Sequence, residues 1–451
     1  MKTTLLFLSV FLSANLFGQY TDTPDANFEQ ALIDLGYDSG NPNGWVPTAN
    51  ISNVDTLDIS NFSIQSVEGI EDFTSLVYLD CSFNSLNELN VSSMPNLTYL
   101  DCSVNSYISN LNLSNNNQLD FLNAEICNLP ALDISNNLLL KYLKINGNSY
   151  LNSIIGLSDL YALEYFSFWN SSSYQGIIDM SGNPSLKYLR IANGYIDSIN
   201  ISENIALEFL DCQQTAISSL NISNNINLKY LRCDGNYSLD LTNNVNLEEL
   251  WVIDGSISSL DLTNCISIEK INIVGTQISS IDISNCPQLS KLNLYFNPLI
   301  TELDVSNNTL LDTIVCGQSS IVSLDCHNNV NLSSLQCNNN ALTCLNIKNG
   351  NNENLGVVAI NNPSLYCVEV DDPIWSANNW SSLQQFDLMV VFDNDCANDC
   401  SSPTAGISEL ASSKNLIRIL DMMGRETSFK PNTPLIYVYD DGSTEKVFTI
   451  E

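Results

Sequence analysis

The segment from Asn204 to Cys233, NIALEFLDCQQTAISSLNISNNINLKYLRC, contains the same motif twice, about 21 residues apart. Leu210-Asp211-Cys212 and Leu231-Arg232-Cys233 each place a polar residue between two apolar ones, and Leu220-Asn221-Ile222 repeats this pattern halfway between them. Because alternate side chains of an extended segment face opposite ways, the outer members of each triplet face inward and the middle one meets solvent. One repeat therefore predicts two short extended segments.

Both triplets recur from about Leu57 to Ile360. The first triplets centre on Asp80, Asp101, Asn123, Lys144, Arg190, Asp211, Arg232, Trp251, Asn272 and Asn293. The second triplets centre on Asp133, Asn200, Asn221, Asp261, Asp282 and Asp304. A single repeat cannot cover its own apolar side chains, whereas repeats stacked at a strand spacing of about 4.8 Å build one continuous core. The sequence predicts a solenoid, whose function lies in its surface.

This pattern resembles the leucine-rich repeat, LxxLxLxxN, in the short form of bacterial surface proteins such as the internalins, where Cys often fills the third apolar position. The resemblance covers residues 57–360. It implies a leucine-rich-repeat solenoid of short repeats, mostly strand and loop, with a parallel β-sheet on its concave face. We assign residues 51–366 to this solenoid. The repeats from Leu143 to Phe166 to Leu189 are two residues longer than the others, and loops on one face absorb such changes.

The composition favours an acidic binding protein over a nucleic-acid or membrane-surface protein. The chain has 451 residues, 15 basic and 50 acidic side chains, and a net charge of -35. Such a negative field repels phosphate backbones and anionic lipids, so we expect no nucleic-acid partner. After the N-terminal region, no apolar run is long enough to predict a transmembrane segment.

Six of the 14 cysteines fall in the same inward-facing position of the repeat. Those at this position are Cys81, Cys102, Cys212, Cys233, Cys316 and Cys337, where other repeats have Ile, Val or Leu. Parallel neighbours keep their Cβ atoms about 4.8 Å apart, whereas a disulfide prefers roughly 3.5–4.5 Å. We therefore favour free thiols over bridges between adjacent repeats. Cys265 and Cys286 follow Asn in a turn, and their state stays open.

The N-terminal region predicts a signal peptide followed by a helical cap. Residues 1–19 combine Lys2, an apolar run and a polar end, which is typical of a secretory signal. Residues 20–50 form the expected cap, with a helix that places Phe28, Leu32 and Leu35 on one face and ends at Gly36. The apolar face would cover the open first repeat.

Residues 367–400 lose the repeat and predict a C-terminal cap. Export would place these cysteines in an oxidising compartment, where a bridge between Cys367 and Cys396 is favoured and one between Cys344 and Cys400 is a second candidate. Metal binding is the rival interpretation. The spacing C-x3-C with one distant histidine does not match a zinc site.

The chain ends in a linker, residues 401–406, and a distinct segment, residues 407–451. Alternating residues at 416–420, 435–439 and 447–450 predict a small β-sandwich. Met423-Gly424-Arg425-Glu426, residues 430–434 and Asp441-Gly442 resemble the C-terminal sorting domain of the type IX secretion system of Bacteroidetes. The resemblance implies export by that machinery and release, or attachment at the outer cell surface. A plain C-terminal module is the alternative.

An aromatic residue precedes the inward Leu or Phe of the first triplet in eight successive repeats: Tyr78, Tyr99, Phe121, Tyr142, Tyr165, Tyr188, Phe209 and Tyr230. Glu249, Lys270 and Lys291 follow in the same position. The rings would form either a stabilising ladder or a flat apolar stripe that grips sugars or extended peptides. The concave face also carries the other binding candidates, which are Trp169, Arg190, Arg232 and Trp251.

A second outward column follows the other triplet: Asp58, Asp133, Asp179, Asp240, Asp261, Asp282, Asp304 and Asp325. It could collect calcium, but no glycine-rich calcium loop accompanies it, so we favour carboxylates that satisfy the backbone of turns. His327 is the only histidine, and the neighbouring Cys326 should face inward, which argues against a Cys–His dyad. We predict no catalytic residue, metal or cofactor.

These observations support two hypotheses about function. The first is a secreted or cell-surface leucine-rich-repeat protein that recognises a protein or a glycan on its concave face. The alternative is a structural protein of the cell envelope or matrix without a discrete ligand. An enzyme is not expected, because no nucleophile elbow, phosphate loop or pair of carboxylates across a cleft is present in the sequence.

Overall fold

The structure, a computed structural model, describes residues 19–236, 238–380, 385–397, 400, 416–420, 425–427, 435–439 and 444–447. The chain divides into two compact units, Met1–Cys400 and Ser401–Glu451, which are described separately. Except for Gln19, the predicted signal peptide lies outside the described residues.

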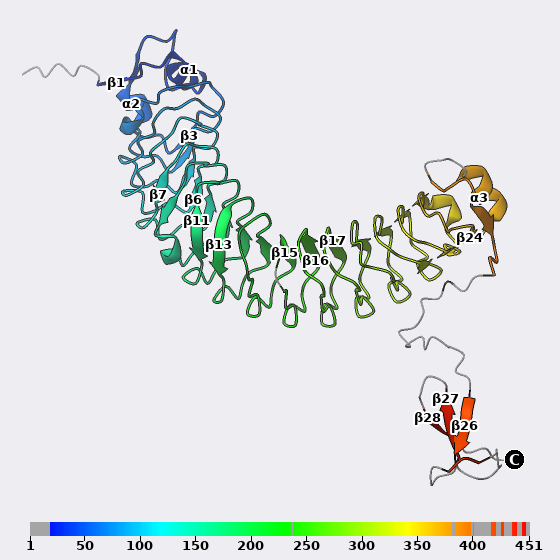
Figure 1. Cartoon of the computed structure of the whole chain (residues 1–451). Helices are drawn as coiled ribbons and strands as arrows, with labels where there is room; N and C mark the ends of the chain where they lie inside the picture. Colours follow the sequence, from blue (N-terminus) through cyan, green and yellow to red (C-terminus); the bar gives the residue numbers. More distant parts are fainter. Residues whose placement is uncertain are drawn as a thin grey trace, which may run out of the picture. The chain divides into compact units, whose positions relative to one another are not determined.

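The first unit is a solenoid built on one parallel sheet of fifteen short strands (Figure 1). Its strands are β3 (Thr56–Asp58), β4 (Tyr78–Asp80), β5 (Tyr99–Asp101), β6 (Phe121–Asn123), β8 (Tyr142–Lys144), β10 (Tyr165–Ser167), β12 (Tyr188–Arg190), β14 (Phe209–Asp211), β15 (Tyr230–Asp234), β16 (Glu249–Ile253), β17 (Lys270–Val274), β18 (Lys291–Asn293), β19 (Thr313–Val315), β21 (Ser334–Gln336) and β23 (Gly356–Val358). Each strand pairs in register with its neighbour, so that equivalent residues of successive coils lie side by side. The predicted leucine-rich-repeat solenoid is confirmed.

The second triplet of each coil pairs less continuously. It forms short parallel sheets from β7 (Ala131–Asp133) and β9 (Ser153–Ile155), from β11 (Gln175–Asp179) and β13 (Tyr195–Asn200), and from β20 (Ser323–Asp325), β22 (Cys344–Asn346), β24 (Cys367–Glu369) and β25 (Val391–Asp393). Short 3₁₀ turns lie at Ile70–Asp72, Leu157–Asp159 and Asn352–Asn354, and the last two follow strands β9 and β22 in their coils. Strands β24 and β25 extend this sheet into residues 367–400. The predicted C-terminal cap therefore begins inside a sheet that continues from the solenoid.

Buried asparagines bind the coils to one another. Asn105 donates from Nδ2 to the carbonyls of Cys81 and Cys102, both at 3.0 Å, and its Oδ1 accepts from the backbone of Leu86. In a second column, Asn137 donates to the carbonyls of Leu113 and Asn116 at 3.2 and 2.8 Å. Because unpaired buried backbone carbonyls are costly, these amides stabilise the bends at which they occur.

The inward cysteines behave as small core residues. Ten of the 14 cysteines, all within the described residues, are buried and form no disulfide. Cys265 and Cys286 occupy the second asparagine column, where both are fully buried. Cys127 occupies the first asparagine column. Its thiol donates to the carbonyl of Cys102 in the preceding coil at 3.4 Å, just as the amide of Asn105 donates to the carbonyl of Cys81. The thiols predicted from the repeat are therefore not bridged between coils.

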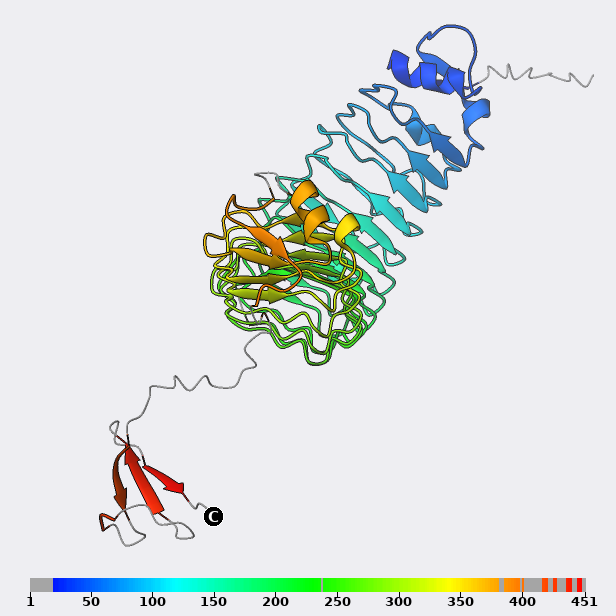
Figure 2. The ribbon, with the colours of Figure 1, turned by 90° about the vertical axis from the view of Figure 1, so that its right-hand side faces the viewer.

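A helical cap covers the first coil (Figure 2). It consists of the antiparallel strands β1 (Tyr20–Asp22) and β2 (Trp45–Pro47) and the helices α1 (Ala26–Asp34) and α2 (Thr48–Ile51). Asp25 caps α1 by accepting from the backbone of residues 27 and 28, and Phe28 and Leu32 are buried as predicted. The prediction for Leu35 is wrong: this residue is 42% exposed, because it follows the last helical turn, and Ala31 is buried instead.

The other end of the solenoid is closed by α3 (Pro373–Asn379), aromatic residues and two disulfides. Asp372 caps α3, and Trp375 meets Trp380 edge to face at 5.5 Å. The disulfides join Cys367 to Cys396 and Cys344 to Cys400, the two pairs that the sequence analysis names.

The described residues of the second unit form one antiparallel sheet of three strands, β26 (Leu416–Leu420), β27 (Leu435–Tyr439) and β28 (Thr444–Val447). Strand β28 begins three residues before the predicted strand, and residues 448–450 lie outside the described residues. So do the linker 401–406 and the motif glycines Gly424 and Gly442. The β-sandwich of this unit stays a prediction.

Candidate binding face

The eight predicted aromatic residues form one uninterrupted stack on the fifteen-stranded sheet. Neighbouring ring centroids are 4.1–4.6 Å apart, and the ring planes diverge by only 8–13° from Tyr78 to Tyr230. The in-register pairing explains this geometry, because each ring starts from the same position of adjacent strands. We call these eight residues the aromatic ladder.

Stacking changes what the aromatic ladder offers to a ligand. Each inner ring turns both faces to its neighbours, so ring edges and hydroxyl groups are the parts left for solvent. Burial also raises the pKa of Tyr142, Tyr165, Tyr188 and Tyr230, as expected for phenols packed against one another. The inner rings therefore present no open face, and whether the aromatic ladder binds a ligand stays a prediction.

Charged pairs border the aromatic ladder. One position earlier in the coil, Lys187 meets Glu164 at 2.8 Å and Lys229 meets Glu208 at 2.7 Å. Where the ladder ends, the next coil has Glu249, whose Oε1 lies 2.5 Å from Nζ of Lys270. The ring stack thus gives way to an ion pair in the same column of the sheet.

Beside the aromatic ladder lies a group of five residues, which we call the Trp/Arg cluster: Trp169, Arg190, Asp211, Arg232 and Trp251. The guanidinium carbon of Arg190 is 4.9 Å from the ring centroid of Trp169, and that of Arg232 is 5.5 Å from Trp251. Nε of Arg190 lies 3.2 Å from Oδ2 of Asp211. Each contact combines a cation with an aromatic face or a carboxylate, which favours a fixed geometry.

The sheet positions this cluster. Arg190, Asp211, Arg232 and Trp251 are direct partners on four successive strands, β12, β14, β15 and β16. Trp169 is held one coil earlier, where its backbone accepts from Gly147 and donates to Oδ1 of Asn146. The repeat alone predicts that Arg190, Asp211, Arg232 and Trp251 are neighbours on successive strands.

Asp211 is the buried centre of the Trp/Arg cluster. Its side chain is only 4% exposed, and burial raises its pKa, against the opposing effect of a backbone hydrogen bond and the two neighbouring arginines. The carboxylate forms an ion pair with Arg190 and interacts electrostatically with Arg232, its partner on the next strand. Asp211 is not one of the twelve predicted binding residues, although its position in the register places it between Arg190 and Arg232.

Eleven of the twelve predicted binding residues lie on strands of one sheet, and Trp169, just beyond β10, contacts Arg190 of that sheet. Two further residues that the sequence analysis leaves out also lie there. Lys144 is 5.5 Å from the ring centroid of Tyr142 and 3.8 Å from Glu125, and Glu249 accepts from Nε1 of Trp251 at 3.5 Å. Their position in the repeat is the signal that could have identified them.

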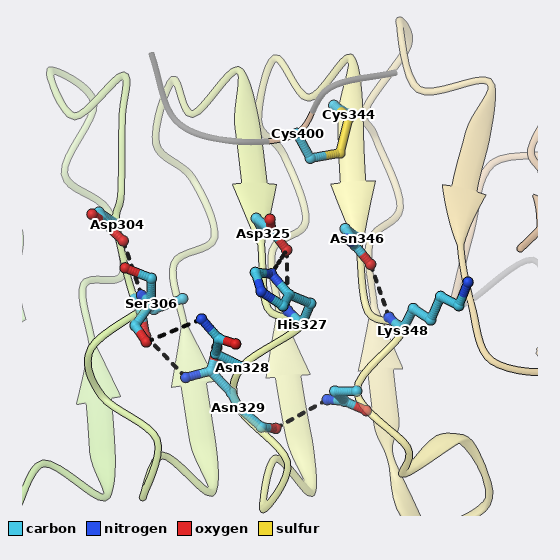
Figure 3. A network of polar contacts seen from close by, with 12 residues as sticks. Asp304, Ser306, Asp325, His327, Asn328, Asn329, Cys344, Asn346, Lys348 and Cys400 are labelled. Atoms are coloured by element: carbon cyan, nitrogen blue, oxygen red, sulfur yellow. Dashed lines mark hydrogen bonds and ion pairs between the residues drawn. A yellow bond between two sulfur atoms is a disulfide. The ribbon is translucent and has the colours of Figure 1, made fainter. Parts of the chain in front are cut away.

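The second outward column behaves as favoured from the sequence. The carboxylates of Asp304 and Asp325 and the amide of Asn346 lie on neighbouring coils and accept from the backbone two residues later (Figure 3). Asp58 does not belong to this column: it lies on β3 and pairs with Asp80 in the main sheet. The sequence Leu-Asp-Ile-Ser around Asp58 also surrounds Asp133 of the second column. Only the stacking of the coils therefore shows which column each of these aspartates belongs to.

No catalytic arrangement surrounds the single histidine. His327 is half exposed, with Nδ1 2.9 Å from Oδ1 of Asp325 (Figure 3), whereas the neighbouring Cys326 is fully buried. Among the described residues, no three His, Cys, Asp or Glu side chains are grouped so that they could hold a metal ion. In the described part of the chain, no helix is both long and apolar enough to cross a membrane.

Comparisons with known proteins support the fold. No protein-family model matches the chain, and no curated protein is similar to it in sequence. Among solved structures, it is similar to the functional domain of InlJ from Listeria monocytogenes, which includes a cysteine ladder, with 22% identity over 96% of this chain and 99% of that one and a TM-score of 0.68. A TDR receptor is similar with 19% identity over 72% of this chain and 61% of that one and a TM-score of 0.54. At these identities, the likeness shows the leucine-rich-repeat fold alone.

Proposed function

We propose that this chain is an exported leucine-rich-repeat protein that binds a protein partner on the concave face of its solenoid. The Trp/Arg cluster is the observation that carries the proposal. Trp, Tyr and Arg dominate the energetics of protein interfaces, and this cluster concentrates both arginines of residues 19–400 and two tryptophans on five successive coils. The ordered row of ring edges and hydroxyl groups beside it extends the contact surface.

The geometry favours a protein over a glycan. Sugar recognition by aromatic residues uses an open ring face, whereas the inner rings of the aromatic ladder cover one another and each tryptophan of the cluster has a guanidinium over its ring. Ring edges, hydroxyl groups and cations suit the polar groups and side chains of a polypeptide.

The test is a screen of the purified chain against arrayed proteins and arrayed glycans. A protein ligand is expected, and its affinity should fall at least about tenfold when Trp169→Ala and Trp251→Ala are combined. Arg232→Gln is the milder second variant, because it leaves the contact between Arg190 and Asp211 in place. The matched control replaces exposed tyrosines outside the cluster, Tyr107→Ser and Tyr150→Ser, and should bind normally. Binding only to glycans would reject the proposal.

A structural role in the envelope or matrix is the second candidate, and the aromatic ladder favours it. A ladder whose rings serve only stability needs no ligand. Under this alternative, the double tryptophan variant changes the unfolding transition, and no arrayed protein or glycan binds.

We also propose export by the type IX route, with residues 1–19 as the signal peptide and 407–451 as the sorting domain. Two disulfides in the solenoid support an oxidising destination, because such bonds persist outside the cytosol. Deletion of residues 407–451 should leave the chain in the periplasm of a host that has this machinery, whereas the intact chain reaches the surface or the medium. Equal export of both chains would exclude the sorting role.

A further inference from the structure

A second apolar column lies outside the concave face, in the turn that follows the second buried asparagine column. In the later coils it consists of Ile205, Ile226, Val245, Ile266, Pro287 and Val330, which we call the apolar stripe. The exposed fractions of its four isoleucine and valine residues from 205 to 266 are 59, 49, 42 and 57%, and Val330 is 55% exposed. These side chains are much more open than the core.

The fold does not require apolar side chains at these positions. Asn117 in an earlier coil, and Thr309 between Pro287 and Val330 of the stripe itself, occupy the same place directly after the buried Asn116 and Asn308, and both are exposed. The stripe residues follow buried ladder residues in the same way, as Ile226 follows Asn225 and Ile266 follows Cys265. An aligned row of exposed apolar residues without a structural need indicates a contact surface.

Carboxylates border the apolar stripe on both sides at Val245 and Ile266 and on one side at Ile205, Pro287 and Val330, whereas the border positions at Ile226 are Asn221 and Lys229. Those that precede it are Asp240, Asp261, Asp282, Asp304 and Asp325, and those that follow it are Glu248, Glu269 and Asp312. Hydrogen bonds from the hydroxyl groups of residues 242, 263 and 284 lower the pKa of Asp240, Asp261 and Asp282, so these groups are charged at neutral pH. Between residues 240 and 333, no lysine or arginine occupies either border position.

We propose that the apolar stripe is a second docking surface, which binds a basic amphipathic helix of a partner protein. Apolar side chains of the helix would lie on the stripe, and lysines or arginines beside them would face the two acidic borders. The pitch of an α-helix, about 5.4 Å, is close to the spacing of the coils, about 4.8 Å, so a helix along the solenoid can place one apolar residue on each coil.

Charge argues against a second copy of this chain as the occupant. Two stripes that met face to face would bring together acidic borders of chains that each carry a net charge of -35. A basic partner avoids this repulsion, and its positive charges are attracted to the acidic borders of the stripe. The inference depends on residues outside the Trp/Arg cluster, so either binding surface can fail without the other.

The test uses the full chain and a synthetic peptide of about 18 leucines and lysines, with leucines along one helical face, which spans roughly 27 Å as a helix. Binding is followed by fluorescence anisotropy of the labelled peptide. A scrambled peptide of the same composition controls for charge alone, and a peptide with glutamate in place of lysine controls for apolar contact alone. We expect the amphipathic basic peptide to bind at least about tenfold more tightly than either control.

The matched variant combines Ile226→Thr, Val245→Thr, Ile266→Thr and Val330→Thr, which copy the natural Thr309. It should lose at least about tenfold in affinity, whereas the double tryptophan variant of the concave face should bind the peptide normally. Asp240→Asn, Asp261→Asn and Asp282→Asn should weaken binding and flatten its salt dependence, and Asn occurs in this column at Asn200 and Asn221.

Three results would overturn the proposal. The first is equal affinity for the scrambled peptide, and the second is unchanged affinity of the threonine variant. The third is a dimer in sedimentation equilibrium that the threonine variant abolishes, because the occupant would then be a second copy of the chain.

Discussion

The aromatic ladder and the apolar stripe both repeat once per coil, yet they leave different surfaces. In the ladder, in-register strands bring flat rings to 4.1–4.6 Å, and the rings cover one another. In the stripe, aliphatic side chains project from turns and are too small to close the gap between coils, so Ile205 and Ile266 stay more than half exposed. Periodicity alone therefore does not distinguish a stabilising column from a docking surface. The backbone that carries the column and the shape of its side chains decide.

The largest expected effect comes from breaking the aromatic ladder at its centre. Tyr165→Ser removes two stacked contacts and the burial of one ring, which we expect to lower the free energy of unfolding by about 3 kcal/mol. Tyr78→Ser, at the end of the ladder, removes one contact and should cost about half as much. Urea unfolding measures both. Equal losses at the two positions would show that stacking adds nothing to burial.

Tyr165→Phe is the control for this comparison. Phe121 and Phe209 stack in the same ladder with the same spacing, so a ring without a hydroxyl group should keep most of the stability. A loss as large as that of Tyr165→Ser would assign the stability to the hydroxyl group.

A second prediction concerns pH. The folded state raises the pKa of Tyr142, Tyr165 and Tyr188, mainly by burial, so these phenols hold their protons more firmly when folded than when unfolded. This contribution is fully present below the unfolded pKa, about 10, and is lost as the pH rises further. The triple change to Phe should flatten the decline of stability above pH 10. Unfolding midpoints between pH 8 and pH 11 test this, and parallel curves for both chains would contradict it.

The repeat predicts the aromatic ladder because the register of short strands follows from evenly spaced Leu triplets. Three details could not be predicted. Asp58 lies in a triplet that fits either column, Leu35 lies just past the point where its helix ends, and the loss of open ring faces depends on ring orientation. The apolar stripe could not be predicted from the sequence, because a single exposed Ile in a turn is common in proteins. The alignment of these residues becomes evident only when the buried residue before each of them is known.

A third prediction extends the ladder by one ring. Glu249→Phe places a ring next to Tyr230, its partner across the strands, and adds one stacked contact. It also removes the ion pair of Glu249 with Lys270 and the hydrogen bond from Trp251. Exposed ion pairs contribute little, so we expect a net gain of about 0.5–1 kcal/mol in thermal or urea unfolding. Glu249→Gln removes the charge alone, and a gain of the same size for that variant would exclude stacking as the cause.

The smallest expected effect is that of Ile226→Thr in the apolar stripe. Ile226 is half exposed, and its coil keeps the buried Asn225 that binds the neighbouring carbonyls of Ile201 and Asn204. The change should therefore alter the free energy of unfolding by less than about 0.5 kcal/mol, while Tyr165→Ser costs several times more. Differential scanning calorimetry of both variants measures this contrast. If Ile226→Thr lowered stability as much as the ladder variant, the stripe would be a second stabilising column, and its apolar character would need no partner to explain it.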